Sequence, residues 1–400
     1  MLYGWEIFIV MSTNQNKNTP MLPQETKNVL LIALIAMLRM FGLFALLPVI
    51  SIFASELQYS SPILIGLSVG AYGLTQAVLQ IPFGYLSDRI GRKPVIIFGL
   101  LIFISGCAIS AYSNTIYGLI AGRLLQGAGA ISATLSALLS DVTRDEVRTK
   151  SMAIFGVGIG ASFLLSLIIG PVISSYYGTK SLFIISIFMS LISIFVLMNI
   201  PSKEITNHHK PVKIVNLLKK NLILHDLNIF FLHQVLTIIF VIFPFMMIDV
   251  FYISAGDHWK YYILSLCISL VLVAPLIMND DKKEKKMNLI IPILLLLSSQ
   301  FILFLFEPSS SLLLISLTIF FIAFNYMEAT LPSRVSILSG KNIRGFSLGI
   351  FSSFQFFGAF TGGIIGGVLI GTFGYAEAHN FLIILIVFWV LIMIGNRKYL

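Results

Sequence analysis

Long apolar runs separated by short polar segments set the pattern of this chain from residue 28 to residue 396. Each run approaches the roughly 20 apolar residues that a helix needs to cross the hydrocarbon core of a bilayer. Twelve runs can be counted, at residues 28–54, 62–87, 94–113, 115–140, 151–176, 180–200, 227–252, 259–278, 288–306, 310–333, 346–371 and 380–396. The pattern predicts an all-α membrane protein with twelve transmembrane helices.

The polar segment 201–226 divides the twelve runs into six and six. Two six-helix halves are the parallel-repeat arrangement of one class of secondary transporters, so we expect two pseudo-symmetric bundles. The expected parts are a cytoplasmic tail (1–27), a first bundle (28–200), a cytoplasmic linker (201–226), a second bundle (227–396) and a short tail (397–400).

The composition favours a lipid environment. Hydrophobic residues make up 57% of the chain and charged residues only 11%, whereas a soluble domain is about 25% charged. The net charge of +9 does not indicate nucleic acid, because the basic residues lie in short segments between apolar runs. Cys107 and Cys267 lie inside apolar runs of opposite halves, so we expect neither a disulfide nor a metal site.

The distribution of basic residues predicts the orientation. With the N-terminus inside, 22 of the 26 Lys and Arg residues fall in cytoplasmic segments. Lys180 and Lys260 fall outside, while Arg39 and Arg123 lie within apolar runs. Such a bias predicts that both termini are cytoplasmic. We expect a multi-pass membrane protein.

Segment 84–94 joins the second and third apolar runs. It carries four charges within six residues, at Asp88, Arg89, Arg92 and Lys93. We expect a tight turn at the membrane surface, with Gly84 ending one helix and Gly91 permitting the turn. A plainer explanation is that any cytoplasmic loop between helices collects basic residues.

Four ionisable residues lie inside apolar runs: Arg39, Arg123, His233 and Glu328. A charge within the membrane is costly and is by default a functional-site hypothesis. Glu328 is the first candidate proton carrier, because burial favours the neutral form of a carboxyl group. His233 is the second, and either arginine could balance the site when the proton leaves. The alternative is that the four residues form structural ion pairs between helices.

Small residues mark two of the expected helices. The fifth run contains Gly170-Pro171, and the eleventh contains Gly358, Gly362 and Gly366 at intervals of four. Such spacing allows close helix contacts. The contacts could permit sliding, or they could serve dense packing without motion.

Three of these motifs resemble those of a known family. Segment 84–94 resembles G-x-L-x-D-R-x-G-R-K, the signature loop of the major facilitator superfamily, and residues 122–130 resemble its R-x-x-Q-G motif. Gly170-Pro171 resembles the antiporter motif of the drug:proton antiporter branch, although Ser166 and Ser174-Ser175 replace expected glycines.

The resemblance implies a location in a bacterial inner membrane and roles for individual residues. Segment 84–94 would hold the two halves together in the outward-facing state, with Asp88 meeting the start of helix 11 near residues 344–347. Arg92 would pair with Asp141, and Arg123 would take part in proton transfer. A similar member of this branch carries a soluble C-terminal domain, which we do not expect here because the chain ends four residues after the last run.

The expected function is proton-coupled efflux of a small molecule by alternating access. Two alternatives remain: a uniporter or importer of a metabolite, and a non-transporting membrane sensor. The sequence has no nucleotide-binding loop and no nucleophile constellation, so we expect no enzyme activity and no cofactor. The expected partners are protons, the lipid bilayer and a small solute that the sequence does not identify. We expect a monomer that binds no nucleic acid.

Overall fold

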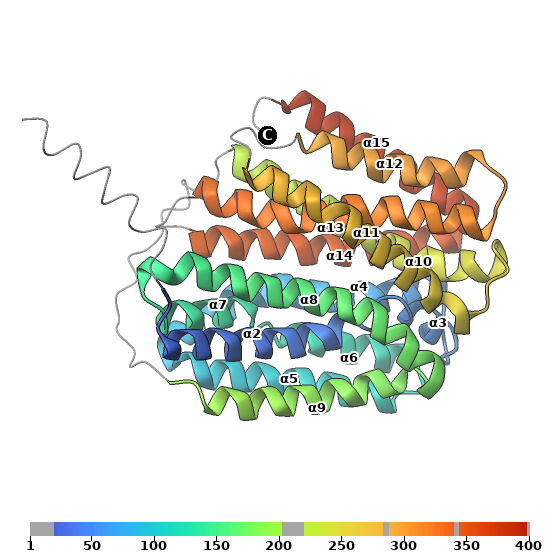
Figure 1. Ribbon diagram of the computed structural model, residues 1–400. Coiled ribbons are helices and arrows are strands. Elements are labelled where there is room, and N and C mark those ends of the chain that lie inside the picture. Colours follow the sequence, from blue (N-terminus) through green and yellow to red (C-terminus); the bar gives the residue numbers. More distant parts are fainter. Residues whose placement is uncertain (1–19, 202–219, 283–287, 340–343, 398–400) are drawn as a thin grey trace, which may run out of the picture.

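A computed structural model of the chain describes residues 20–201, 220–282, 288–339 and 344–397. The described elements are helices packed side by side into two bundles (Figure 1). The first half contains α2 (Pro23–Phe44), α3 (Ile50–Ser55), α4 (Pro62–Ile90), α5 (Arg92–Tyr112), α6 (Ile116–Ala128), α7 (Ser132–Asp141), α8 (Asp145–Tyr177) and α9 (Lys180–Met198). The second half contains α10 (Lys220–Asp249), η2 (Ala255–Asp257), α11 (His258–Lys282), α12 (Ile290–Leu305), α13 (Ser310–Ser339), α14 (Arg344–Phe373) and α15 (Tyr375–Gly395).

The helices have the length and composition of membrane spans. Within the described ranges, ten helices are long and apolar enough to cross a bilayer, and α12 is a shorter apolar helix. The fourth apolar run, residues 115–140, corresponds to α6 and α7 together. The start of α2 and the C-terminus lie at one end of the molecule (Figure 1). We call this the terminal end, and the end that carries α3 the opposite end.

The first apolar run is interrupted, although we expected one helix over residues 28–54. Helix α2 ends at Phe44, residues 45–49 form turns, and α3 resumes at Ile50. Pro48 explains the interruption because it has no N–H to donate to the carbonyl of Phe44. The Leu47 N–H bonds to the Phe44 carbonyl instead, at 3.1 Å.

The fourth run is also divided, into α6 and α7, where we expected one helix over 115–140. The break begins at Gly129, and a Cβ atom at this glycine would overlap the Gly99 carbonyl of α5. Backbone groups freed inside a membrane need protein partners. Arg39 provides one, because its Nη2 donates to the Gly129 carbonyl at 2.8 Å.

Four helices, α2, α8, α10 and α15, begin five to seven residues before the runs expected from the sequence. Helix α2 starts at Pro23 instead of residue 28, and α10 starts at Lys220 instead of residue 227. The first turns of α10 bury Leu222 and Leu224, which explains why the helix extends into the segment expected to be linker. Asp226 therefore lies in a helix and is buried.

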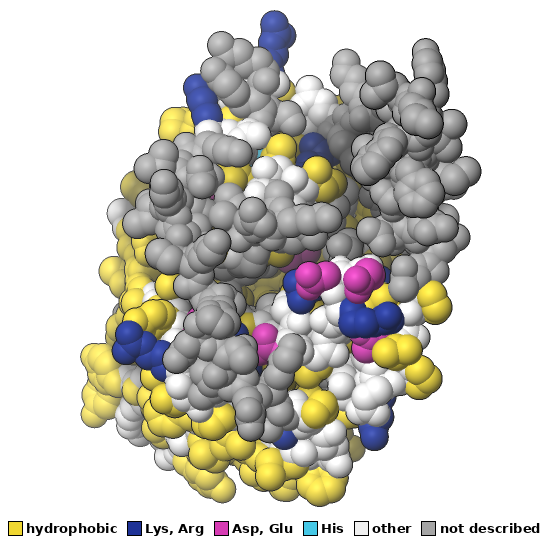
Figure 2. Space-filling model, turned by 90° about the vertical axis from the view of Figure 1, so that its left-hand side faces the viewer, with side chains coloured by type: hydrophobic (Ala, Val, Ile, Leu, Met, Phe, Trp, Pro, Cys, Tyr) yellow, Lys and Arg dark blue, Asp and Glu magenta, His cyan; other side chains and the backbone are white. Residues whose placement is uncertain are grey.

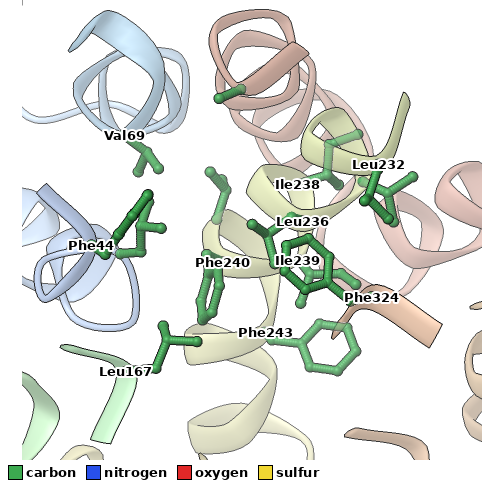
Figure 3. Packing of buried hydrophobic residues seen from close by; sticks show 14 of the residues in the cluster. Phe44, Val69, Leu167, Leu232, Leu236, Ile238, Ile239, Phe240, Phe243 and Phe324 are labelled. Carbon is green, nitrogen blue, oxygen red and sulfur yellow. The ribbon is translucent and has the colours of Figure 1, made fainter. Parts of the chain in front are cut away.

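Apolar side chains fill the contact between the two halves (Figure 3). Phe44, Val69 and Leu167 of the first half face Leu236 and Phe240 of α10 (Figure 3). The ring centroids of Phe163 on α8 and Phe324 on α13 lie 5.4 Å apart.

Glycines bring α14 close to two different helices. Gly66 and Gly70 of α4 lie against the backbone of α14, including Gly363. On another face of α14, Gly358 and Gly362 lie against the backbone carbonyls of Phe230 and Gln234 in α10, and Gly366 approaches Val241 of the same helix. Gly358, Gly362 and Gly366 therefore pack within the second half, whereas Gly363 belongs to the seam between the halves.

A hydrogen bond joins the halves near the opposite end. Pro244 lies inside α10 and has no N–H for the Phe240 carbonyl. Ser51 of α3 donates its hydroxyl to this carbonyl at 2.7 Å. Charged side chains gather instead at the terminal end, where acidic and basic groups lie side by side (Figure 2).

Candidate functional site

Three polar side chains from three helices of the second half come together. Gln355 of α14 donates through Nε2 to Glu328 Oε1 of α13 at 3.0 Å. The same nitrogen lies 2.8 Å from Nε2 of His233 on α10. His233 Nε2 and Glu328 Oε2 are 3.7 Å apart. We call these three residues the His–Gln–Glu cluster.

The cluster is largely buried, although part of the Glu328 side chain is exposed. The Glu328 side chain is 30% exposed, although it lies well inside a 30-residue helix, whereas that of His233 is 7% exposed. Glu328 Oε2 has no hydrogen-bond partner. Two residues from Gln355, Ser353 donates to the Ala77 carbonyl of α4 at 3.1 Å, so the cluster lies beside the seam between the halves.

The hydrogen bonds of the cluster depend on its protonation. An amide nitrogen can only donate, so His233 Nε2 accepts from Gln355 and is unprotonated in this arrangement. A proton bound at Nε2 would turn that nitrogen into a donor and break the bond to Gln355. The nearby Glu328 Oε2 would be its natural partner, because it is unpaired. Proton binding can therefore rearrange contacts between α10, α13 and α14.

Phe324 covers the cluster toward the opposite end. It lies one turn before Glu328 on α13, and its ring centroid is 5.7 Å from that of His233. It also contacts Phe163 of the first half. The cluster thus lies directly under an aromatic contact between the two halves.

Arg39 is buried in the first half. Its Nη2 donates to Gln76 Oε1 at 2.8 Å and to the Gly129 carbonyl at 2.8 Å. Its Nη1 lies 3.4 Å from the Ser132 hydroxyl. The guanidinium therefore ties α2 to α4 and to the break between α6 and α7.

Arg123 of α6 is fully buried beside α4. It donates to Gln126 Oε1 at 2.7 Å and to the backbone carbonyl of Ser68 at 3.2 Å. Its guanidinium carbon lies 4.5 Å from the ring centroid of Tyr72, a cation–π contact. Carbonyl groups, an amide and an aromatic face surround this charge.

The four ionisable residues that we selected from the sequence thus lie in two places. His233 and Glu328 come together in the second half, while Arg39 and Arg123 are held separately within the first. Among the described residues, neither arginine forms an ion pair with a carboxylate. The alternative of interhelical ion pairs would apply only to His233 and Glu328, at 3.7 Å. In the same part of the chain, no three His, Cys, Asp or Glu side chains come together as metal ligands.

Segment 84–94 consists of two helix ends joined by a tight turn. Helix α4 continues to Ile90 and α5 begins at Arg92. Gly91 alone joins them, with φ at 99°, a conformation that favours glycine. Gly84 does not end a helix, contrary to our expectation, since it lies inside α4 and a Cβ atom there would make an ordinary 3.7 Å contact.

The charges of this segment form a network at the terminal end. Arg92 forms an ion pair with Asp88 and donates through Nε to Asp141 Oδ2 at 3.0 Å. Arg89 stacks on the ring of Tyr85, and Lys93 is half-buried. The expected contact of Asp88 with residues 344–347 falls in part on residues 344–345, whose side chains lie outside the described part.

Gly170 contacts the interrupted first span. A Cβ atom at this glycine of α8 would overlap the Ala45 carbonyl, which lies in the turns between α2 and α3. Pro171 follows inside the same helix. These two residues therefore let α8 approach the non-helical backbone at 45–49.

Sequence reasoning missed the polar partners of the ionisable residues. Gln355 bridges His233 and Glu328, and Gln76 pairs with Arg39. An amide side chain inside an apolar run was the available signal, since each lies in a predicted span. Hydropathy does not reveal how each helix is rotated about its axis. The sequence therefore does not show which ionisable residue forms a hydrogen bond with each amide.

The sequence profile of the Major Facilitator Superfamily matches residues 32–363. The chain belongs to this superfamily. Its facilitator fold is also seen in a solved D-xylose-proton symporter, with a TM-score of 0.75, 16% sequence identity, and coverage of 92% of this chain and 97% of that one. Proteins of this superfamily are transporters, so this facilitator is a membrane transporter and not an enzyme.

Two relatives extend the comparison. This facilitator is 38% identical to the inner membrane transport protein YajR of Escherichia coli (strain K12) over 336 residues, which cover 82% of this chain and 74% of YajR. It is 34% identical to the class B tetracycline resistance protein of Escherichia coli over 137 residues, or 33% of each chain.

Proposed function

We propose that this facilitator exports a small molecule in exchange for protons, and that the His–Gln–Glu cluster binds the exchanged proton. The single observation that carries the proposal is the Glu328 carboxylate, which has one buried oxygen unpaired, 3.7 Å from His233. A carboxyl group within a membrane span is a natural proton carrier.

The geometry supports a coupling mechanism. A proton entering the cluster changes which groups Gln355 and His233 can bond, and these residues lie on α14 and α10. Both helices contact the first half: α14 through the glycine seam with α4, and α10 through the Ser51 bond at the Phe240 carbonyl. Protonation can therefore bias the contact between the halves, as alternating access requires.

The proposed orientation places the terminal end in the cytoplasm of a bacterial cell, in line with the distribution of basic residues. YajR is named as an inner membrane protein. The contacts near α3 would then close the outer side of the transporter. The network around Arg92 would act on the cytoplasmic side. Efflux is the proposed direction because one relative is named as a tetracycline resistance protein.

Reconstitution in liposomes with an internal pH dye tests this function. Candidate solutes are added in turn, and solute-dependent proton flux identifies both the substrate and the coupling. Glu328→Gln should abolish that flux, because the amide cannot exchange a proton. Glu307→Gln is the matched control, since Glu307 is exposed between α12 and α13. Flux in Glu328→Gln equal to that of the control would rule out Glu328 as the carrier.

A further inference from the structure

Asp226 is a buried carboxylate that the His–Gln–Glu cluster does not include. It lies on α10 near the terminal end and is 5% exposed. Its Oδ1 is buried without a hydrogen-bond partner. Buried polar groups in proteins are nearly always hydrogen-bonded, so each exception requires an explanation.

A cavity lies beside this carboxylate. It is lined by residues of three helices: Leu222 and Asp226 of α10, Val335 of α13, and Ser347 and Ile350 of α14. The Ser347 hydroxyl is also buried without a partner. Two unpaired oxygens from different helices thus share a cavity whose other walls are apolar.

Among the side chains that the structure describes, which do not include that of Arg344 at the start of α14, none forms an ion pair that neutralises Asp226. The ionisable neighbours are His225, which precedes it on α10, and Arg334, which precedes Val335 on α13 and has other interactions. Neither forms an ion pair with Asp226 in the described structure. Residues 346–373 of α14 include no ionisable side chain.

Energetics favour a neutral carboxyl group at this position. An ionised carboxylate away from water costs far more than its neutral form unless it is paired, and such a group takes up a proton instead. The protonated acid has an O–H that can donate to Ser347 or to a water in the cavity. Asp226 also precedes His233 by seven residues, which places the two on nearly the same face of α10, about 10 Å apart along the axis.

We propose that Asp226 is a second proton-binding site of this transporter, with its proton held in the cavity beside Ser347. Its part in the transport cycle rests on the proposed function. If that function holds, the Asp226 proton passes through the cluster, so Asp226→Asn should lower the number of protons exchanged per solute whereas Glu328→Gln abolishes the flux. The binding of the proton itself can be tested without a substrate.

Infrared difference spectroscopy of the purified full chain in lipid nanodiscs provides this test. At neutral pH, the wild-type protein should show a carboxylic-acid C=O band that disappears in Asp226→Asn. The band should persist in Glu328→Gln, because the two sites are separate. Asp249→Asn is the matched control, since Asp249 is an exposed residue of the same helix and its change should leave the band intact.

Three results would overturn the proposal. One is an Asp226→Asn spectrum identical to that of the wild type. Another is a large loss of thermal stability in Asp226→Asn, because asparagine resembles the neutral acid and should be tolerated in its place. The third is removal of the band by sodium ions at constant pH, which would make the carboxylate a cation ligand. A lost Asp226 band combined with normal proton flux in Glu328→Gln would instead contradict only the proposed function.

Discussion

At the scale of single residues, the two halves differ in the hydrogen-bond partners of their buried charged groups. Arg39 and Arg123 bond to carbonyl and amide groups and lie against aromatic rings within the first half, with only Nε of Arg39 left without a partner. Glu328 and Asp226 each keep an unpaired carboxylate oxygen in the second half. Satisfied charges hold a structure in place, whereas unsatisfied ones can take up a proton. We therefore assign the arginines to architecture and the two acids to coupling.

Arg39→Lys tests the architectural role. Lysine keeps the charge but cannot reach Gln76 and the Gly129 carbonyl together in a fork geometry. Leaving a buried acceptor unpaired costs about 1–3 kcal/mol, so the melting temperature in detergent should fall. Arg397→Lys at the exposed end of the chain is the control. An unchanged melting temperature in Arg39→Lys would show that the fork is not needed.

At the scale of helices, sequence periodicity predicted the spans but not their interruptions. The lengths of the apolar runs predicted twelve spans, and the polar segment 201–226 predicted the division into halves. Averaged hydropathy does not register a single Pro48 or Gly129, so the breaks after α2 and α6 were missed. The start of α10 was missed because the charged residue Asp226 was assigned to the polar linker. Only the structure shows that it is buried in a helix. Helix rotation also decides which glycines of α14 face α4.

Gly66→Ala tests the seam between the halves. A Cβ atom here would overlap the backbone of Gly363 and Gly367, and backbone cannot move aside as a flexible side chain can. Overpacking of this kind costs about 1–3 kcal/mol, so both the melting temperature and the transport rate should fall. Gly160→Ala is the control, because a Cβ atom there meets nothing within 4 Å. Equal behaviour of the two variants would contradict a tight seam.

Ser51→Ala tests the bond that joins the halves at the opposite end. Without the hydroxyl, the Phe240 carbonyl loses its donor, and a hydrogen bond of this kind contributes about 0.5–1.5 kcal/mol. The population opened at this end should rise by roughly 2- to 10-fold. Spin labels on the exposed residues Tyr59 and Tyr252 would report the change as a longer distance.

The control for this experiment is Ser55→Ala, because Ser55 donates to Ile52 within its own helix. Its distance distribution should match that of the unmodified protein. If Ser51→Ala gives the same distribution as Ser55→Ala, the Ser51 bond does not hold the halves together.

At the scale of the whole molecule, different kinds of contact lie at different depths along the membrane normal. Apolar packing and the Ser51 bond join the halves near the opposite end. The charged network of Arg92 and Asp141 lies at the terminal end. The His–Gln–Glu cluster lies between them, under the contact of Phe324 with Phe163. A change of protonation there acts on helices that reach both ends.

The central claim is that Glu328 couples solute movement to protons, and one measurement separates coupling from transport. Proteoliposomes are assayed with the solute identified by the proton-flux screen, both for solute exchange at equal pH and for accumulation driven by a pH gradient. We predict that Glu328→Gln retains exchange but loses gradient-driven accumulation, while Glu307→Gln retains both. Accumulation by Glu328→Gln at the level of the control would contradict the account.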